Sequence, residues 1–145
     1  MTGGLRVLVV DDVAPALDEM CQLLREAPGV GSVEAAGDAL TALRLIQTTA
    51  PDAVFLDIAM PGMDGLELAG LLGRMTDPPT IVFVTAYEQH AVSAYGVGAV
   101  DYLLKPVSAE RLAAALGREN RVRAAGAAPA PAVDELAAVP VELGG

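Results

Sequence analysis

Two hydrophobic patterns alternate along most of the chain. Short runs of mostly apolar residues are typical of buried β-strands. Each run is followed by a segment in which apolar residues recur every three or four positions, which is typical of an amphipathic helix. The strand-like runs are Leu5 to Val10, Ser32 to Ala36, Ala53 to Asp57, Thr80 to Thr85 and Val100 to Leu104. The pattern therefore predicts five strand-helix units.

Punctuating residues indicate where the predicted helices begin and end. Helix starts are marked by a proline in the first turn or by an Asp or Ser cap, at Pro15, Asp38, Asp64 and Ser108. Pro28-Gly29 and Pro51 end the first two helices. The fourth segment, 88–95, contains little leucine and is followed by two glycines, so we expect it to be the least stable helix.

This alternation favours a doubly wound α/β fold, because parallel strands need crossovers and right-handed crossovers place helices on both faces of the sheet. We expect a five-stranded parallel sheet with strand order 2-1-3-4-5, the flavodoxin-like order. Residues 1–123 form this domain in our interpretation. Residues 124–145 are rich in Ala and Pro and contain no Lys or Arg, so we interpret them as a linker and the possible start of a truncated second domain.

Composition and charge exclude several classes of function. The 145 residues suit one hydrophobic core, and the net charge of −10 repels a nucleic-acid backbone. The longest segment without a charged residue, 89–100, is shorter than the roughly 18 apolar residues of a membrane span. No signal-peptide pattern is present, so we expect a cytoplasmic domain that does not contact membranes. The single cysteine, Cys21, excludes a disulfide within the chain and suggests an inert core thiol.

Carboxylates follow two of the predicted strands. Asp11 and Asp12 follow the first strand and Asp57 ends the third, so the expected strand order brings them to the crevice where ligands bind in such sheets. Two carboxylates about 4 Å apart repel each other by about 4 kcal/mol at an effective dielectric near 20. Either a retained proton or a hard cation such as Mg²⁺ must offset this repulsion.

A hydroxyl and an ammonium group complete this set. Thr85 and Lys105 end the fourth and fifth strands at the same edge of the sheet. Together the residues suit phosphoryl transfer, with Asp57 as the nucleophile that forms an acyl phosphate. Lys105 and Thr85 would bind the phosphoryl oxygens, and a metal held by the other two carboxylates would neutralise developing charge.

Four motifs resemble the signature of the response-regulator receiver domain, over roughly residues 5 to 120. They are Val7-Leu-Val-Val-Asp11-Asp12, Leu56-Asp57-Ile-Ala-Met-Pro61-Gly-Met-Asp-Gly65, Val84-Thr85-Ala86 and Asp101-Tyr102-Leu-Leu-Lys105-Pro106. The resemblance implies that Asp57 accepts phosphate from the histidine of a sensor kinase. It also implies that Mg²⁺ is bound by Asp11, Asp12, Asp57 and the main-chain carbonyl of Ala59.

The same resemblance implies a conformational switch. Thr85 and Tyr102 would change position on phosphorylation, and the face formed by helix 4, strand 5 and helix 5 would form a homodimer. The bond between Lys105 and Pro106 would be cis. Such a domain is not an enzyme acting on other molecules, although it is expected to catalyse its own phosphorylation and dephosphorylation.

Two stretches, 86–92 and 97–106, are similar to receivers that precede a LytTR-type DNA-binding domain, and residues 139–145 resemble the opening of that domain. This implies a transcription regulator that contacts DNA only through a missing C-terminal output domain.

Two other functions stay open from the residues. An aspartate-nucleophile phosphatase of the haloacid dehalogenase type also uses Asp, Thr, Lys and Mg²⁺, but Asp57-Ile58-Ala59 lacks that family's second acid. A phosphate-independent dimerisation module would have the same fold with a vestigial pocket. Outside the motif positions, Asp52, Asp64, Asp77 and Asp101 are interpreted as turn, cap or solvated residues.

Overall fold

The computed structural model describes residues 4–86, 96 and 98–125, with side chains as far as residue 123. Its elements, in chain order, are β1 (Leu5–Val10), α1 (Ala14–Glu26), β2 (Val30–Ala36), α2 (Ala39–Thr49), β3 (Ala53–Leu56), α3 (Gly65–Leu72), β4 (Thr80–Thr85), β5 (Asp101–Leu104) and α5 (Ala109–Ala125). The helix predicted at 88–95 lies outside the described residues.

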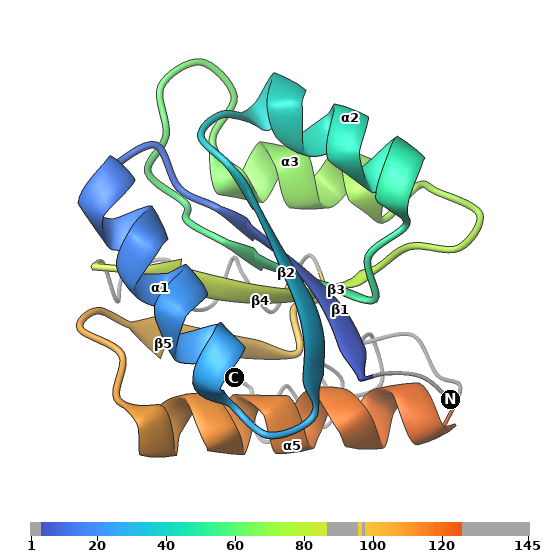
Figure 1. The fold of residues 1–145 in the computed structure, drawn as a ribbon. Helices are drawn as coiled ribbons and strands as arrows, with labels where there is room; N and C mark the ends of the chain where they lie inside the picture. The colour runs from blue at the N-terminus through green and yellow to red at the C-terminus, as the bar shows by residue number, and fades with distance from the viewer. Residues whose placement is uncertain (1–3, 87–95, 97, 126–145) are drawn as a thin grey trace.

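The strands form one parallel sheet with the order β2-β1-β3-β4-β5 (Figure 1). The predicted doubly wound, flavodoxin-like fold is confirmed. One strand begins earlier than predicted, because β2 starts at Val30, which pairs with Leu5. Gly31 interrupts the apolar run in the sequence, but main-chain pairing with β1 extends the strand across it.

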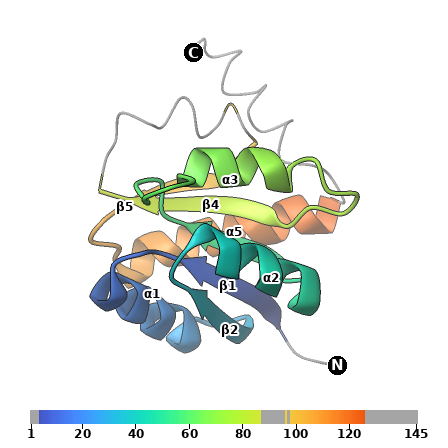
Figure 2. The ribbon, with the colours of Figure 1, turned by 90° about the horizontal axis from the view of Figure 1, so that it is seen from above.

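Helices cover both faces of the sheet (Figure 2), and each face has its own core of buried side chains. On one face, Ala42 and Ile46 of α2 and Leu68 of α3 pack against side chains of the central strands. On the other face, Leu24 of α1 and Leu112 of α5 do the same. β3 and β4 are buried along their whole length, as expected for strands covered on both faces.

The helix starts follow the predicted signals. Asp38 accepts a hydrogen bond from the N–H of Thr41 at 2.7 Å. Asp64 and Glu67 form a reciprocal capping box at the start of α3. Ser108 accepts a hydrogen bond from the N–H of Arg111 at 3.1 Å, at the start of α5. These caps therefore fix the helix starts that directly follow the loops at the carboxyl ends of the strands.

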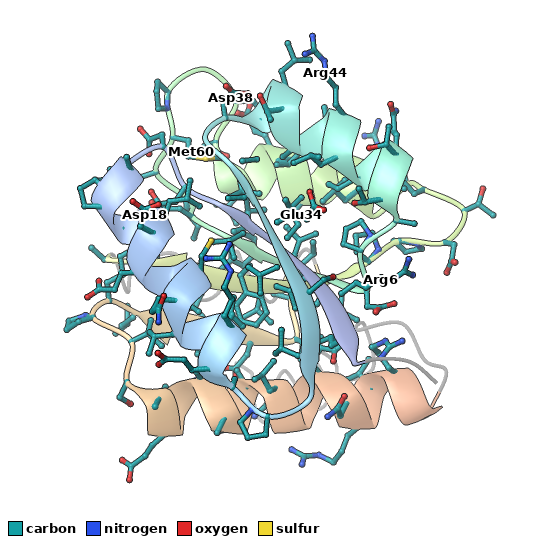
Figure 3. All side chains as sticks on the ribbon, viewed as in Figure 1. Arg6, Asp18, Glu34, Asp38, Arg44 and Met60 are labelled. Carbon is teal, nitrogen blue, oxygen red and sulfur yellow. The ribbon has the colours of Figure 1, made fainter. Side chains whose placement is uncertain are left out.

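Several charged side chains on the outer surfaces of the helices and of the edge strand face solvent. Asp18 on α1, Glu34 on β2 and Arg44 on α2 are exposed on the outer surfaces of their elements (Figure 3). No helix among the described residues is long and apolar enough to cross a membrane.

Candidate functional site

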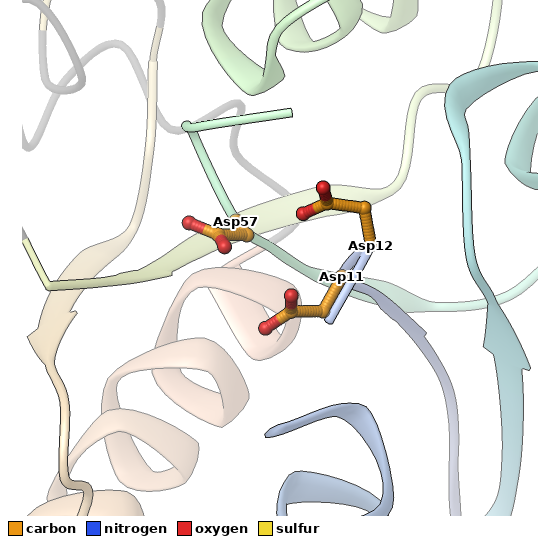
Figure 4. Close-up of side chains that lie close together, drawn as sticks. All are labelled: Asp11, Asp12 and Asp57. Atoms are coloured by element: carbon orange, nitrogen blue, oxygen red, sulfur yellow. The ribbon is translucent and has the colours of Figure 1, made fainter. Parts of the chain in front are cut away.

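Three carboxylates meet where β1 and β3 end (Figure 4). The N–H of Asp57 donates to the carbonyl of Val10 at 2.9 Å, so the ladder between the two strands extends to the first residue after β3. One oxygen each from Asp11, Asp12 and Asp57 lie within 4.8 Å of one another. Asp11 and Asp57 are buried, whereas Asp12 is exposed. The predicted cluster therefore forms, with one side open to solvent.

Lys105 joins this cluster from the end of β5. Its Nζ donates to Oδ2 of Asp11 at 2.7 Å and to Oδ2 of Asp57 at 3.2 Å. The N–H of Lys105 donates to the carbonyl of Thr85 at 2.9 Å, which places the ends of β4 and β5 side by side. The peptide bond between Lys105 and Pro106 is cis, as the resemblance implied.

The charges in the cluster do not balance. Burial, reinforced by the negative charge of Asp11, raises the pKa of the Asp57 carboxyl above its ordinary value, although Lys105 opposes the change. Burial alone would lower the pKa of Lys105, but hydrogen bonds and charges from Asp11 and Asp57 outweigh it and raise that pKa. One ammonium group thus lies among three carboxylates and contacts two of them, so the site carries excess negative charge.

This donor set fits a magnesium ion. All three side chains offer carboxylate oxygens, which are the ligands that Mg²⁺ prefers, and the exposure of Asp12 leaves room for the waters that Mg²⁺ retains. A divalent cation would also remove the unbalanced repulsion between the carboxylates.

The loop after Asp57 is held close to the strand end. The N–H of Ala59 donates to Oδ1 of Asp57 at 3.3 Å, and the N–H of Gly65 donates to the carbonyl of Ile58 at 2.9 Å. A Cβ at Gly65 would lie 2.1 Å from the carbonyl oxygen of Asp57, so only glycine fits there. Gly62 has φ +81°, which also favours glycine.

Thr85 and Tyr102 lie on neighbouring strands. Thr85 is fully buried, and among the described residues its hydroxyl oxygen has no hydrogen-bond partner. A buried polar group of this kind is uncommon and often marks a functional site. Tyr102 is 8% exposed and its ring packs against Phe83, with ring centroids 6.4 Å apart.

A cavity of about 300 Å³ lies beside the carboxylate cluster. Its lining includes Asp11 and Lys105 from the cluster, Met20 and Leu23 from α1, and Val107. The site thus adjoins a cavity lined by both charged and apolar side chains.

Two buried acids were missed by the sequence interpretation. Asp101 was expected to be a turn or solvated residue, and this was wrong: it is fully buried and paired with Arg111 of α5 at 2.7 Å. Glu119 is also fully buried, where Thr80 donates to it at 3.2 Å. The helical spacing of Leu112, Leu116 and Glu119 on one stripe could have indicated its burial.

A comparison with known protein families identifies the family of this chain. Residues 7–117 match the model of the response regulator receiver domain.

The chain belongs to the response-regulator receiver family. An uncharacterized response regulatory protein of Yersinia pestis is 47% identical over 117 residues, which cover 81% of this chain and 49% of that protein. The sensory transduction protein LytT of Bacillus cereus is 44% identical over 117 residues, covering 81% of this chain and 48% of LytT. The chain therefore spans about half the length of the curated relatives it matches.

Solved receiver structures share the fold. The crystal structure of the response regulatory domain of protein mrkE from Klebsiella pneumoniae is similar with a TM-score of 0.73 and 34% identity. The match covers 80% of this chain and 95% of that one. Receiver domains are regulatory parts of two-component systems, and this membership confirms the resemblance predicted from the four motifs.

Proposed function

We propose that this domain is a phosphorylation-driven switch that accepts a phosphoryl group on Asp57 from a sensor histidine kinase. The observation that carries the proposal is the arrangement of Asp11, Asp57 and Lys105, in which a single ammonium group contacts two buried carboxylates. A third carboxylate, on Asp12, completes an oxygen-only set beside them. Excess negative charge and an available aspartate oxygen are what a metal-assisted phosphoacceptor requires.

The transfer exchanges one bond to phosphorus for another. The bond from phosphorus to the kinase imidazole breaks while a carboxylate oxygen of Asp57 forms an acyl phosphate, and the leaving imidazole takes a proton from solvent. Asp11, Asp12, Asp57 and the carbonyl of Ala59 would hold Mg²⁺, which when bound supplies positive charge to the transferring group. The Nζ of Lys105 is 3.2 Å from Oδ2 of Asp57, so the ammonium group can bind the phosphoryl oxygens when they are attached to Asp57.

Thr85 and Tyr102 act as the switch. The buried Thr85 hydroxyl, which is without a hydrogen-bond partner among the described residues, donates to a phosphoryl oxygen once that group is present. Its movement vacates space for the Tyr102 ring, so phosphorylation shifts an equilibrium between two packings. The face formed by the helix predicted at 88–95, by β5 and by α5 changes with it and forms a homodimer.

The output is proposed from the relatives. Similarity to proteins named LytT supports a receiver (residues 1–123) that controls a LytTR-type DNA-binding domain through a linker at 124–145. Because the chain carries a net charge of −10, DNA contact would belong to that output domain alone. The regulator would work in the cytoplasm, where its kinase holds the phosphoryl donor.

The test is the mass of the intact chain after incubation with Mg²⁺ and acetyl phosphate. We expect the mass to increase by one phosphoryl group, and we expect EDTA or Asp57→Asn to prevent the increase. Asp18→Asn, which changes an exposed aspartate on α1, is the matched control and should behave as wild type. An unchanged wild-type mass would contradict the proposal, and steady phosphate release from diverse monoesters would indicate a phosphatase instead.

A further inference from the structure

Asp101 and Arg111 form an ion pair with two parallel hydrogen bonds. Nη2 of Arg111 donates to Oδ1 of Asp101 at 2.7 Å, and Nη1 donates to Oδ2 at 3.0 Å. Asp101 is fully buried, while the Arg111 side chain is 41% exposed. The two parallel hydrogen bonds fix the orientation of the guanidinium plane relative to β5.

The same two residues hydrogen-bond to both main-chain polar groups of Tyr102. The N–H of Tyr102 donates to Oδ1 of Asp101 at 2.8 Å. The carbonyl of Tyr102 accepts from Nη2 of Arg111 at 3.3 Å. β5 is the edge strand of the sheet, where main-chain groups have no neighbouring strand on one side. The pair therefore supplies, at this residue, contacts that a sixth strand would otherwise provide.

The main chain of Arg111 is held at the start of α5. Its N–H donates to the Ser108 hydroxyl, which caps the first turn of α5. The contacts from Ser108 through Arg111 to Asp101 thus connect the start of α5 to β5. This strand contains Tyr102, and Lys105 directly follows it.

We propose that Arg111, acting through Asp101, is a positioning residue for the Tyr102 switch. The inference rests on the proposed function, in which the Tyr102 ring changes place after Asp57 is phosphorylated. With its main chain held at the N–H and the carbonyl, Tyr102 responds by rotation of its side chain rather than by movement of the edge strand. Without Arg111, the main chain of β5 moves as well when Asp57 is phosphorylated. The Tyr102 ring then has no single position in the activated state.

Arg118 provides a matched control. Its Nε lies 3.7 Å from Oδ2 of the same aspartate, and it is on the same helix. Among the described residues, it makes no hydrogen bond to the main chain of Tyr102, whose N–H and carbonyl bind Asp101 and Arg111. Removing Arg118 changes the charge around Asp101 without releasing Tyr102, so it separates positioning from simple charge balance.

The experiment follows the Tyr102 ring directly. The chain contains three tyrosines, so uniform 3-fluorotyrosine labelling gives three ¹⁹F resonances, and Tyr102→Phe assigns one of them. In the wild type, Mg²⁺ with beryllofluoride should move the Tyr102 resonance to one new position. In Arg111→Gln, we expect that displacement to be lost or to fall to a minor fraction, with a broadened resonance. Arg118→Gln should respond as wild type.

Two further measurements separate this role from a loss of stability or of phosphorylation. All variants are compared at a temperature where circular dichroism shows them folded, and phosphorylation of Asp57 is followed by mass, which Arg111→Gln should leave intact. Arg111→Lys keeps the charge but cannot make the forked contact, so it should remain defective.

The contrary outcomes are distinct. A full, sharp displacement in Arg111→Gln would overturn the inference, as would an equal loss in Arg118→Gln. A wild-type Tyr102 resonance that does not respond although Asp57 is phosphorylated would overturn it together with the switch role of Tyr102. Failure of Asp57 to accept phosphate would overturn the proposed function itself.

Discussion

Asp57 and Asp101 are both buried aspartates that face a cation, yet their pKa values move in opposite directions. Burial and the charge of Asp11 raise the pKa of Asp57, against one contact from Lys105. Burial also opposes ionisation of Asp101, but hydrogen bonds from Arg111 and from the Tyr102 N–H outweigh it and hold that pKa below its ordinary range. A facing cation therefore does not decide the direction by itself. Asp57 also lies beside the like charge of Asp11, whereas Asp101 receives several hydrogen bonds and faces a second arginine, Arg118.

The difference separates a reactive carboxylate from a structural one. Asp57 lies at the carboxyl end of β3, where the parallel strands leave an open edge. Each of its carboxylate oxygens accepts one hydrogen bond, from Ala59 at 3.3 Å or from Lys105 at 3.2 Å, which leaves lone pairs for a metal and a phosphoryl group. Asp101 begins β5 and has every oxygen engaged by nitrogen donors, so it contributes to the packing of α5 on the sheet.

The largest expected effect on stability comes from replacing Asp101, the structural carboxylate. Asp101→Asn should lower the free energy of unfolding by about 3 kcal/mol, because it removes the buried carboxylate charge that accepts hydrogen bonds from Arg111 and from the Tyr102 N–H. Urea denaturation at pH 7 measures the change, with Asp18→Asn as an exposed control. A loss as small as that of the control would contradict the role given to Asp101.

A smaller effect is expected from displacing the loop that follows Asp57, the reactive carboxylate. Gly65→Ala should lower the free energy of unfolding by about 2 kcal/mol, because the new Cβ would overlap the Asp57 carbonyl oxygen. It should also slow phosphorylation by acetyl phosphate. Gly70→Ala, on the same helix where a Cβ meets nothing within 4 Å, is the control and should retain the wild-type rate.

Neutralising the reactive aspartate should have the opposite sign to neutralising the structural one. Without divalent cations at pH 7, Asp57→Asn should raise the free energy of unfolding, by less than Asp101→Asn lowers it. The physical reason is that ionised Asp57 is disfavoured by burial and by Asp11. A destabilised Asp57→Asn chain, measured by the same urea titration, would show that its charge is fully compensated.

The smallest effect concerns Glu119, a third buried acid. Burial raises its pKa, although Arg123 and a hydrogen bond from Thr80 oppose this. A raised folded-state pKa means that the folded chain binds the proton more tightly, so this stabilisation is present below the unfolded pKa of about 4.3 and is lost as pH rises through the folded-state value. Thermal unfolding should show the stability of Glu119→Gln relative to wild type increasing over that window; a constant difference would contradict the burial argument.

The fold and the carboxylate cluster were predictable for one physical reason. In a parallel sheet the strand ends share an edge, so the positions of Asp11 and Asp57 after two apolar runs were sufficient to place them together. Lys105 followed from the same reasoning at the end of β5.

Other features depend on contacts that sequence patterns do not record. The early start of β2 depends on pairing between Leu5 and Val30. Burial of Asp101 depends on an arginine ten residues later that returns across the turn into α5. The sequence between them carries no periodic signal for such a pairing, because it is a tertiary contact between a strand edge and a helix.

The central claim, that Asp57 and not its acidic neighbours carries the phosphoryl group, is tested most directly by locating it. After phosphorylation with acetyl phosphate and Mg²⁺, borohydride reduction converts an acyl-phosphorylated aspartate to homoserine, which peptide mass spectrometry can place. We predict homoserine at position 57 alone, with none in the presence of EDTA. Homoserine at position 11 or 12, or at no position, would contradict the account.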